Sequence, residues 1–472
     1  MDNTLTCSSP LAKEPARSGS LHLWPTVGFA VLATLLMSLP NLLDPMIRHD
    51  DFPAFFADPE PFWNKTLHEG RWINYLWHLR EMVTPSWLNF AIYQVFWAVF
   101  AGAIAVATIG SRENQWFATV LALVIVAAHS ATQISLWFNT LMPGLATVAL
   151  YAVLGCTLTP RAHRLLLPPF VIASFMAYTT YPLLLLAVCL VRTRDRSIAD
   201  LAGLLILFVL SFAAAVLSVY AINLQVHGIF GVPLAEWRNA SPAHDVAGLV
   251  ANFSYFVESL ELYATGTSFT FDSVIIFHLT MLSLATIFVA RAAPLEALYL
   301  HAGLWMGLAL VAAQNLKLGV IVPPRAFMFA WVCYAVLLVR AAQHLGNRSE
   351  LLGRIARNLV LLIFVCHFLA NVVQYSCYRA WQSETRAIAE SLADAPQPVL
   401  IKGNVMEMPS AKAAYVQLNV ALPFRLRQVA GIEAILCEDD PGYCDELEAG
   451  WAAGKTSAGT VYRVETEPPS PQ

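Results

Sequence analysis

Residues 22–52, HLWPTVGFAVLATLLMSLPNLLDPMIRHDDF, join a long apolar run to a pair of neighbouring carboxylates. Residues 22–43 contain no Asp, Glu, Lys or Arg and are long enough to cross a hydrocarbon core, which takes roughly 20 apolar residues. No small-residue cleavage site precedes Asp44, so the run is interpreted as a membrane anchor and not as a signal peptide. We therefore expect Asp50 and Asp51 to lie close to a membrane surface.

The composition of the whole chain agrees with a membrane protein. Of the 472 residues, 57% are hydrophobic and only 13% are charged, whereas an average soluble protein has about 25% charged residues. A chain this apolar cannot keep its surface in water, so the bilayer is its expected solvent. The basic residues are scattered singly, without the stripe or patch that nucleic-acid binding requires.

Apolar runs of spanning length recur along the first three quarters of the chain. They lie near 22–43, 87–109, 116–135, 138–158, 198–222, 272–290, 294–313, 320–340 and 357–376. The apolar run at 165–191 is interrupted by the sequence YTTYP at 178–182. This break predicts two short helices that turn back within the membrane. Together these segments predict an all-α polytopic membrane protein with about 11 transmembrane helices.

Basic residues predict the orientation and the domain organisation. If 165–191 is a hairpin, the arginines of 192–196 and of 340–357 fall on one side, which we expect to be the cytoplasm. The expected organisation is a cytoplasmic tail at 1–20, a membrane domain at 21–379 with an outer loop at 44–85, and a tail at 380–472 outside the cell membrane. NFSYFVESLELYATGT, at 252–267, is interpreted as an amphipathic helix at the interface.

The tail at 380–472 predicts a small extracytoplasmic α+β domain. ETRAIAESLADA has helical periodicity, and PVLIKGN and TVYRVET are typical of short strands. Cys437 and Cys444, in CEDDPGYC, are bounded by turn residues, and in an oxidising compartment we expect them to form a disulfide. Their spacing and the lack of a nearby histidine argue against a metal site.

The loop at 44–85 is dense in acids, aromatic residues and turn residues. A loop that decorates the membrane interface is one interpretation, since Trp and Tyr collect at the headgroup level. In an extended segment, however, neighbouring side chains point to opposite faces. One of Asp50 and Asp51 can then face a reaction centre, while the other holds a metal, an arginine or a backbone amide.

These residues resemble a known family. A span followed by an outer Asp-Asp-aromatic motif, and some twenty residues later by an aromatic residue and Gly-Arg-Trp or Gly-Arg-Pro, resembles the membrane O-antigen glucosyltransferases of serotype-converting phages. Those proteins belong to the GT-C class of polytopic glycosyltransferases. The matching residues are 49–52 (His-Asp-Asp-Phe), Trp63 and 70–72 (Gly-Arg-Trp). The chain departs from the pattern at Trp72, where the family commonly has proline.

The resemblance implies transfer of a sugar, glucose in the family, from a polyprenyl-phosphate donor to a cell-surface glycan such as O-antigen. The enzyme would be a multi-pass protein of a bacterial inner membrane, with its N-terminus cytoplasmic, its C-terminus periplasmic and its site on the periplasmic face. Asp50 is then expected as general base and Asp51 as its neighbour, and the reverse assignment stays open. No cofactor is firmly implied, although a divalent cation bound by Asp50 and Asp51 stays open, because the class is divided on metal use.

Further residues receive expected roles from their position. Arg325, after two prolines, and Lys317 lie at the outer edges of apolar spans and are expected to bind the donor phosphate; snorkelling to headgroups is the alternative. Arg71 is expected to hold the loop by pairing with Asp51 or Glu60, and Trp63 to support the loop or the acceptor.

Other assignments stay open. Trp137 and Asn139, in a short outer turn, either line an acceptor cleft or form part of an interface belt. His129, His278 and His301 lie on apolar runs and are expected to be core histidines. The main alternative function is a polytopic transporter or a flippase for lipid-linked sugars, and the others are a polysaccharide polymerase or ligase and a non-catalytic scaffold. Transporters usually have ionisable residues within their spans, which are nearly absent here.

Overall fold

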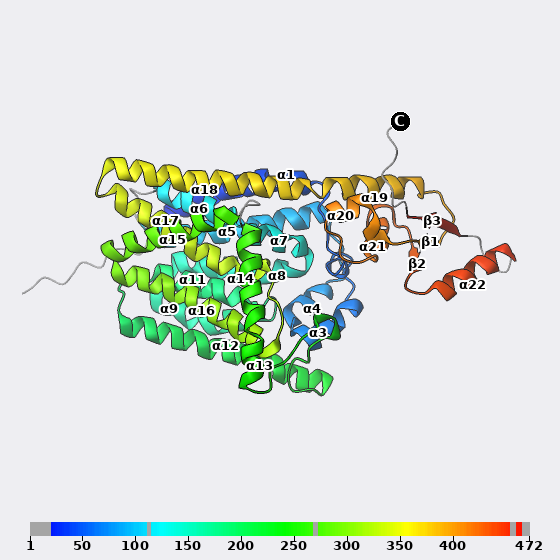
Figure 1. The fold of residues 1–472 in the computed structure, drawn as a ribbon, viewed down its shortest axis with the longest axis horizontal. Coiled ribbons are helices and arrows are strands. Elements are labelled where there is room, and N and C mark those ends of the chain that lie inside the picture. The colour runs from blue at the N-terminus through cyan, green and yellow to red at the C-terminus, as the bar shows by residue number, and fades with distance from the viewer. Residues whose placement is uncertain (1–19, 111–114, 268–271, 454–458, 465–472) are drawn as a thin grey trace, which may run out of the picture.

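A computed structural model describes residues 20–110, 115–267, 272–453 and 459–464; the predicted tail at 1–20 lies outside these ranges except for its last residue. The described chain is mostly helical, with a small parallel sheet near its C-terminus (Figure 1). Within these ranges, eight helical segments are long and apolar enough to cross a membrane. They are Leu23–Leu42, Ser86–Ile109, His129–Thr157, Ile198–His227, Val274–Ala292, Pro294–Leu318, Pro324–Gly346 and Glu350–Ser391. The chain is therefore consistent with a multi-pass membrane protein.

The long helices are α1 (Ser20–Leu42), α5 (Ser86–Ile109), α8 (Phe138–Thr157), α12 (Ile198–His227), α15 (Asp272–Ala292), α16 (Pro294–Leu318), α17 (Met328–Gly346) and α18 (Glu350–Ser376). The shorter elements before residue 200 are α2 (Phe52–Phe55), η1 (Glu60–Phe62), α3 (Trp63–Glu69), α4 (Trp72–His78), α6 (Gln115–Val126), α7 (His129–Ile134), η3 (Ser135–Trp137), α9 (Pro160–Leu165), α10 (Leu167–Phe175) and α11 (Tyr181–Arg192). Those after it are η4 (Glu236–Arg238), α13 (Val246–Ala251), α14 (Phe253–Thr267), η5 (Pro324–Phe327), α19 (Arg379–Ser391), β1 (Val399–Lys402), η6 (Val405–Glu407), α20 (Pro409–Ala413), α21 (Ala421–Ala430), β2 (Ala434–Leu436), α22 (Pro441–Ala452) and β3 (Thr460–Arg463).

The helical bundle has two distinct ends. At one end, α5 stops at Gly110, where the Arg194 guanidinium donates to the carbonyls of Ala107 (2.6 Å) and Thr108 (3.1 Å). At the other end, the Ser86 hydroxyl of α5 accepts a hydrogen bond from Gln428 in the C-terminal region. A helix of 24 residues rises about 36 Å, so the two ends are a membrane thickness apart. We call them the arginine end (Arg164, Arg192, Arg194, Arg196 and Arg340) and the loop end (residues 44–85 and 379–464).

Helices α9, α10 and α11 leave the arginine end and return to it. The Arg192 guanidinium, at the end of α11, donates to the carbonyl of Leu158 and to that of Thr159 (3.4 Å), just before α9. Between α10 and α11 the chain turns, and the carbonyl of Ala177 accepts a hydrogen bond from the Asn74 amide of α4 at 2.8 Å. The two short helices expected in 165–191 are present, and their turn reaches the loop end.

The C-terminal region forms three parallel strands in the order β2-β1-β3, with helices around them. Strands β1 and β3 and helix α19 lie where periodicity predicted them, whereas β2 is too short and irregular to be recognised. Cys437 and Cys444 form a disulfide beside Leu400 of β1. In Figure 1 this sheet lies beyond α20 and α21, at the loop end of the bundle.

An ion pair joins the start of the outer loop to the C-terminal region. The Asp44 carboxylate accepts from the guanidiniums of Arg425 (2.5 Å) and Arg386 (2.9 Å). Burial alone would raise the pKa of Asp44, but the two arginines outweigh it and hold the pKa below its usual value. Asp44 is therefore ionised near neutral pH, and its charge attaches α19 and α21 to the loop.

Two expected segments differ in detail from the structure. The expected span at 116–135 is interrupted, because α6 ends at Val126 and α7 begins at His129. The expected outer turn at 135–143 is instead a single 3-10 turn followed directly by α8, since Asp51 supplies the hydrogen-bond acceptors for the first turn of α8. Helix α14 matches the expected amphipathic helix and runs across the direction of the long helices in Figure 1.

The return of α9–α11 to the arginine end predicts the labelling of engineered cysteines. In a variant whose only native cysteines are the disulfide pair, Arg161→Cys and Arg348→Cys should react with an impermeant maleimide from one side of the membrane. Met82→Cys, at the loop end, should react from the other side. All three side chains are exposed. Reaction of the 161 and 348 positions from opposite sides would contradict the hairpin.

Candidate functional site

Asp51 binds the N-terminus of α8. Its carboxylate accepts hydrogen bonds from the backbone N–H of Thr140 (2.6 Å), the backbone N–H of Asn139 (3.1 Å) and the Asn139 side-chain amide (2.9 Å). The first N–H groups of a helix lack partners within it and favour a negative charge. Asp51 is 0% exposed, and burial raises its pKa to about 6 although these donors oppose the shift. Asp51 thus has no surface from which to contact a substrate.

Asp50 points the other way and stays accessible. Its carboxylate accepts from the Trp137 indole N–H at 2.5 Å and from the Lys65 ammonium at 2.7 Å, and its side chain is 27% exposed. Burial would raise the pKa of Asp50, but Lys65, His49 and the hydrogen bond from Trp137 together hold it below the usual value. Asp50 is therefore an ionised carboxylate at neutral pH, with one face open to solvent.

Trp137 brings two arginines to the same place. The guanidinium carbon of Arg325, from η5, lies 4.4 Å from the centre of a Trp137 ring, and that of Arg48 lies 5.7 Å away. Among the described residues, the Arg325 guanidinium has no carboxylate partner. Burial lowers the pKa of Arg48, and repulsion from Arg325 adds to the effect. We call Arg48, Asp50, Lys65, Trp137 and Arg325 the Trp137 cluster.

The Gly-Arg-Trp motif lies beside this cluster. Gly70 ends α3 with a left-handed conformation (φ +67°), and a Cβ there would lie 2.6 Å from Val219 of α12, so only glycine fits. Arg71 pairs with Glu69 at 2.7 Å and lies 5.7 Å from the ring centre of Tyr178. The Trp72 indole donates to Asn223 of α12 at 2.9 Å. The motif therefore anchors the loop to α12 and to the turn of the hairpin.

Positive charge exceeds negative charge around Asp50. Burial would raise the pKa of Glu69, but Arg71, Lys65 and Arg238 lower it, so Glu69 is ionised as well. The cations of this region are Arg48, Lys65, Arg71, Arg238 and Arg325, and the anions are Asp50, Glu69 and the buried Asp51. Five cations against three anions leave a formal excess of two positive charges when Asp51 is ionised, since the neutral N–H groups of α8 bind its charge without cancelling it. Such a surplus suits an anionic ligand such as a phosphate.

The other site residues expected from the sequence either lie away from this excess of positive charge or support the loop around it. Lys317 donates to the carbonyl of Ala243 at 2.6 Å and so holds the segment between α12 and α13. Glu60 is exposed, and Arg71 pairs with Glu69 and not with Glu60 or Asp51, contrary to the expectation from sequence. Trp63 is 37% exposed and packs edge-on against Trp72 and Tyr75, which makes it a support of the loop.

Sequence reasoning missed several members of the site. Trp137 and Asn139 were assigned to a cleft or an interface belt, whereas they bind Asp50 and Asp51. Lys65, Glu69 and Arg238 were not singled out. Their only signal was the charge itself, in two loops that are otherwise rich in aromatic residues and turns. Their pairing depends on segments that are far apart in the chain, which no local pattern reveals.

The positions of Asp50 and Asp51 can be compared with what a shared metal ion would require. Asp50 and Asp51 diverge, since one contacts Lys65 and Trp137 and the other contacts the start of α8. Within the described ranges, no group of three or more His, Cys, Asp and Glu side chains is arranged to hold a metal ion. Asp50 pairs with Lys65, so the two carboxylates do not face one common position.

The histidines of the apolar helices are hydrogen-bonded. His278 bonds to the Tyr334 hydroxyl at 2.8 Å, His129 to the Asn371 side chain at 3.2 Å, and His301 to the Thr286 hydroxyl at 2.9 Å. His367, which the sequence did not single out, lies 3.4 Å from His278 between their Nε2 atoms. These side chains link α7, α15, α17 and α18 in a polar cluster inside the bundle.

No protein-family model matches this chain, and no curated protein matches it significantly.

The position of Asp51 predicts a large effect on stability. Asp51→Ala leaves the N–H groups of Asn139 and Thr140 buried without an acceptor, so we expect a loss of about 2 kcal/mol. Asp50→Asn keeps an acceptor for Trp137 at a half-exposed position and should leave stability nearly unchanged. Thermal unfolding of both variants in detergent tests this, and equal midpoints for the two variants would contradict the assignment.

Proposed function

We propose that this protein is a membrane glycosyltransferase that moves a hexose, with glucose as the leading candidate, from a polyprenyl-phosphate donor to a cell-surface glycan such as O-antigen. The observation that carries the proposal is an ionised, accessible carboxylate, Asp50, within a surplus of arginine and lysine at one end of a multi-pass bundle. A lipid-linked sugar phosphate has an apolar tail for the bilayer, an anion for the cations and a sugar that projects out of the membrane.

Asp50 is assigned as the general base. The acceptor hydroxyl gives its proton to Asp50 while its oxygen bonds to the anomeric carbon, and the bond from that carbon to the phosphate oxygen breaks. Trp137 and Lys65 hold the carboxylate in place. Lys65 also weakens Asp50 as a base. Because a lysine side chain is flexible, we propose that Lys65 turns towards the donor phosphate when the donor binds, which raises the basicity of Asp50.

The departing polyprenyl phosphate needs positive charge, and Arg325 is assigned to it. The guanidinium of Arg325 lies over a ring of Trp137 and has no carboxylate partner within the described residues, so its donors are available for bidentate contact with a phosphate. Arg48 is largely occupied, because it donates to the carbonyl of Tyr415 and is buried. It is assigned to the electrostatic field of the site and not to direct contact.

One observation favours the alternative of a transporter or lipid flippase. Ionisable side chains inside a membrane bundle often mark a path for protons or substrates. The cluster of His129, His278, His367, Tyr334 and Asn371 is of this type. It favours transport less strongly than the loop favours transfer, because His129, His278 and His301 have neutral hydrogen-bond partners.

The glycosyltransferase proposal predicts the effect of Asp50→Asn on the surface glycan. Loss of a general base lowers the rate by about 10²–10⁴-fold, so the hexose should disappear from surface polysaccharide analysed by mass spectrometry. Asp58→Asn, which changes another acid of the same loop, is the matched control and should keep the hexose.

An unchanged glycan in the Asp50→Asn strain would overturn the enzymatic assignment. If purified protein then moved a labelled lipid-linked sugar across proteoliposomes, the transport alternative would replace it. Low pH gives a further check. Because the pKa of Asp50 in the free enzyme lies below its usual value, kcat/KM for transfer should not decline through protonation of this base until the pH is below about 4.

Arg325→Gln should weaken donor binding. Removal of a charge-assisted contact costs about 1.5–3 kcal/mol, so KM for the lipid-linked donor should rise by at least tenfold. Lys317→Gln is the control, since its ammonium is used by Ala243, and it should change KM much less. The reverse ranking, with Lys317 decisive, would contradict the assignment of Arg325.

A further inference from the structure

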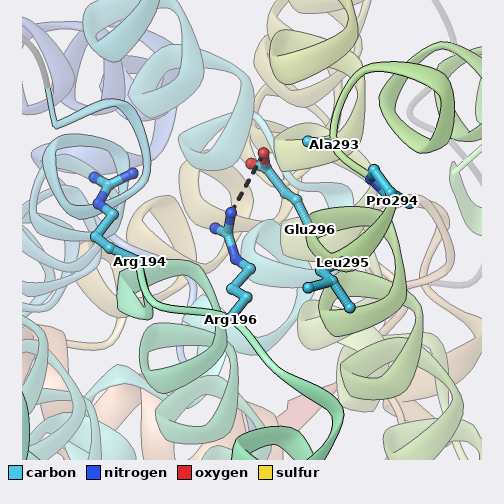
Figure 2. Close-up of a pocket in the computed structure, with 6 residues that line it drawn as sticks. All are labelled: Arg194, Arg196, Ala293, Pro294, Leu295 and Glu296. Atoms are coloured by element: carbon cyan, nitrogen blue, oxygen red, sulfur yellow. Dashed lines mark ion pairs between the residues drawn. The ribbon is translucent and has the colours of Figure 1, made fainter.

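A cavity of about 290 Å³ lies at the arginine end of the bundle. It opens between the linker that joins α11 to α12 and the start of α16, and its lining residues are labelled in Figure 2. They are Arg194, Arg196, Ala293, Pro294, Leu295 and Glu296. Since Arg194 covers the end of α5 opposite to the outer loop, the cavity is separate from the site around Asp50.

The backbone positions both arginines on one side of this cavity. Gly110, at the end of α5, has φ +67°, and a Cβ there would lie 2.1 Å from the Arg194 Nη2 atom. Glycine is thus required for Arg194 to lie over the end of α5. In Figure 2, Arg194 and Arg196 extend from the linker in the same direction, opposite to the first turn of α16. That first turn begins with Pro294, which has no N–H, and the N–H groups of Glu296 and Ala297 donate to the carbonyl of Ala293. Only the Leu295 N–H of this turn lacks such a bond among the described residues.

The cavity is positively charged. Glu296 is neutralised by Arg340, whose guanidinium forms two contacts with its carboxylate at 2.5 and 2.8 Å, and Arg196 lies further away at 3.5 Å. Three arginines therefore face one glutamate. Burial lowers the pKa of Arg194, and repulsion from Arg196 and Arg340 lowers it further. Among the described residues, the buried Nε atom of Arg196 has no hydrogen-bond partner.

Size and position narrow the class of ligand. A cavity of about 290 Å³ is at the lower limit of small-molecule pockets, so it fits a phosphate group with a short polar extension and not a nucleotide sugar. It lies at the end of the membrane-spanning helices α5 and α16, at the level where lipid headgroups meet protein. Basic pockets between helices at this level commonly bind anionic headgroups.

We propose that this cavity is a binding site for a phosphate group, supplied by the headgroup of an anionic lipid. Arg196 binds the phosphate with its guanidinium, and Arg194 adds charge from the same side of the opening. The first turn of α16 completes the site. A bound phosphodiester would relieve the repulsion among Arg194, Arg196 and Arg340 and would join α5, α12 and α16. The proposal does not depend on the function of the outer loop.

Thermal unfolding of the full-length protein in detergent, with added phosphatidylglycerol, phosphatidylcholine or inorganic phosphate, tests the proposal. We expect phosphatidylglycerol to stabilise the wild-type protein at lower concentration than phosphatidylcholine does. Arg196→Gln should weaken this effect by about tenfold or more, as loss of a charge-assisted contact requires. Arg348→Gln, an exposed arginine at the same end that does not line the cavity, is the control and should leave it unchanged.

The added compounds distinguish a lipid headgroup from a free phosphate as the source of the bound phosphate group. Inorganic phosphate that stabilises the protein and competes with phosphatidylglycerol identifies a site for a free phosphate group, whereas an effect of the lipid alone identifies a headgroup site. Equal stabilisation of wild type and Arg196→Gln by phosphatidylglycerol would overturn the proposal. Should Arg196→Gln fail to fold, Arg196→Lys keeps the charge, loses the planar fork and should show weakened binding in native mass spectrometry.

Discussion

The outer loop depends on one interaction, between the Asp51 carboxylate and the first turn of α8. The acceptors of this carboxylate satisfy backbone donors of a membrane-spanning helix that would otherwise be buried without partners. Because Asp51 is held from within, its neighbour Asp50 is turned towards solvent, Lys65 and Trp137. Asp51 thus has the structural role, and it fixes the direction of Asp50, to which we assign the chemical role in the proposed reaction.

The same arrangement explains why cations gather near Asp50. Trp137 immediately precedes α8, so the cap that fixes the helix also fixes the indole. The indole in turn offers its face to Arg325 and Arg48, which come from segments far away in the chain. Attraction between charges alone would leave a long arginine side chain in many conformations. An aromatic face gives each guanidinium a defined position at little cost in desolvation.

Apolar length, periodicity and turn residues predicted most of the helical architecture, since each is a local property of the sequence. In the described part of the chain, eight apolar helices of spanning length, the break near residue 180 and strands β1 and β3 lie where these patterns indicated, whereas the span expected at 116–135 is interrupted and the expected count of about 11 is not established. The partners of Asp51, Arg71 and Lys317 could not be predicted in this way. Asp51 is 88 and 89 positions from the residues it binds, and many polar groups of equal chemical suitability lie between them. Only the packing of the helices selects among those groups.

The attachment of Asp44 to Arg425 has a consequence for the order of assembly during synthesis. These residues are 381 positions apart, so at a typical rate of translation the arginine is made roughly 20 to 80 seconds after the aspartate. Through that interval the first helices can insert, but the loop between them lacks its last support. A ribosome-bound chain therefore has an incompletely supported loop end until its final segment has been made, and a product truncated before Arg425 would lack this attachment.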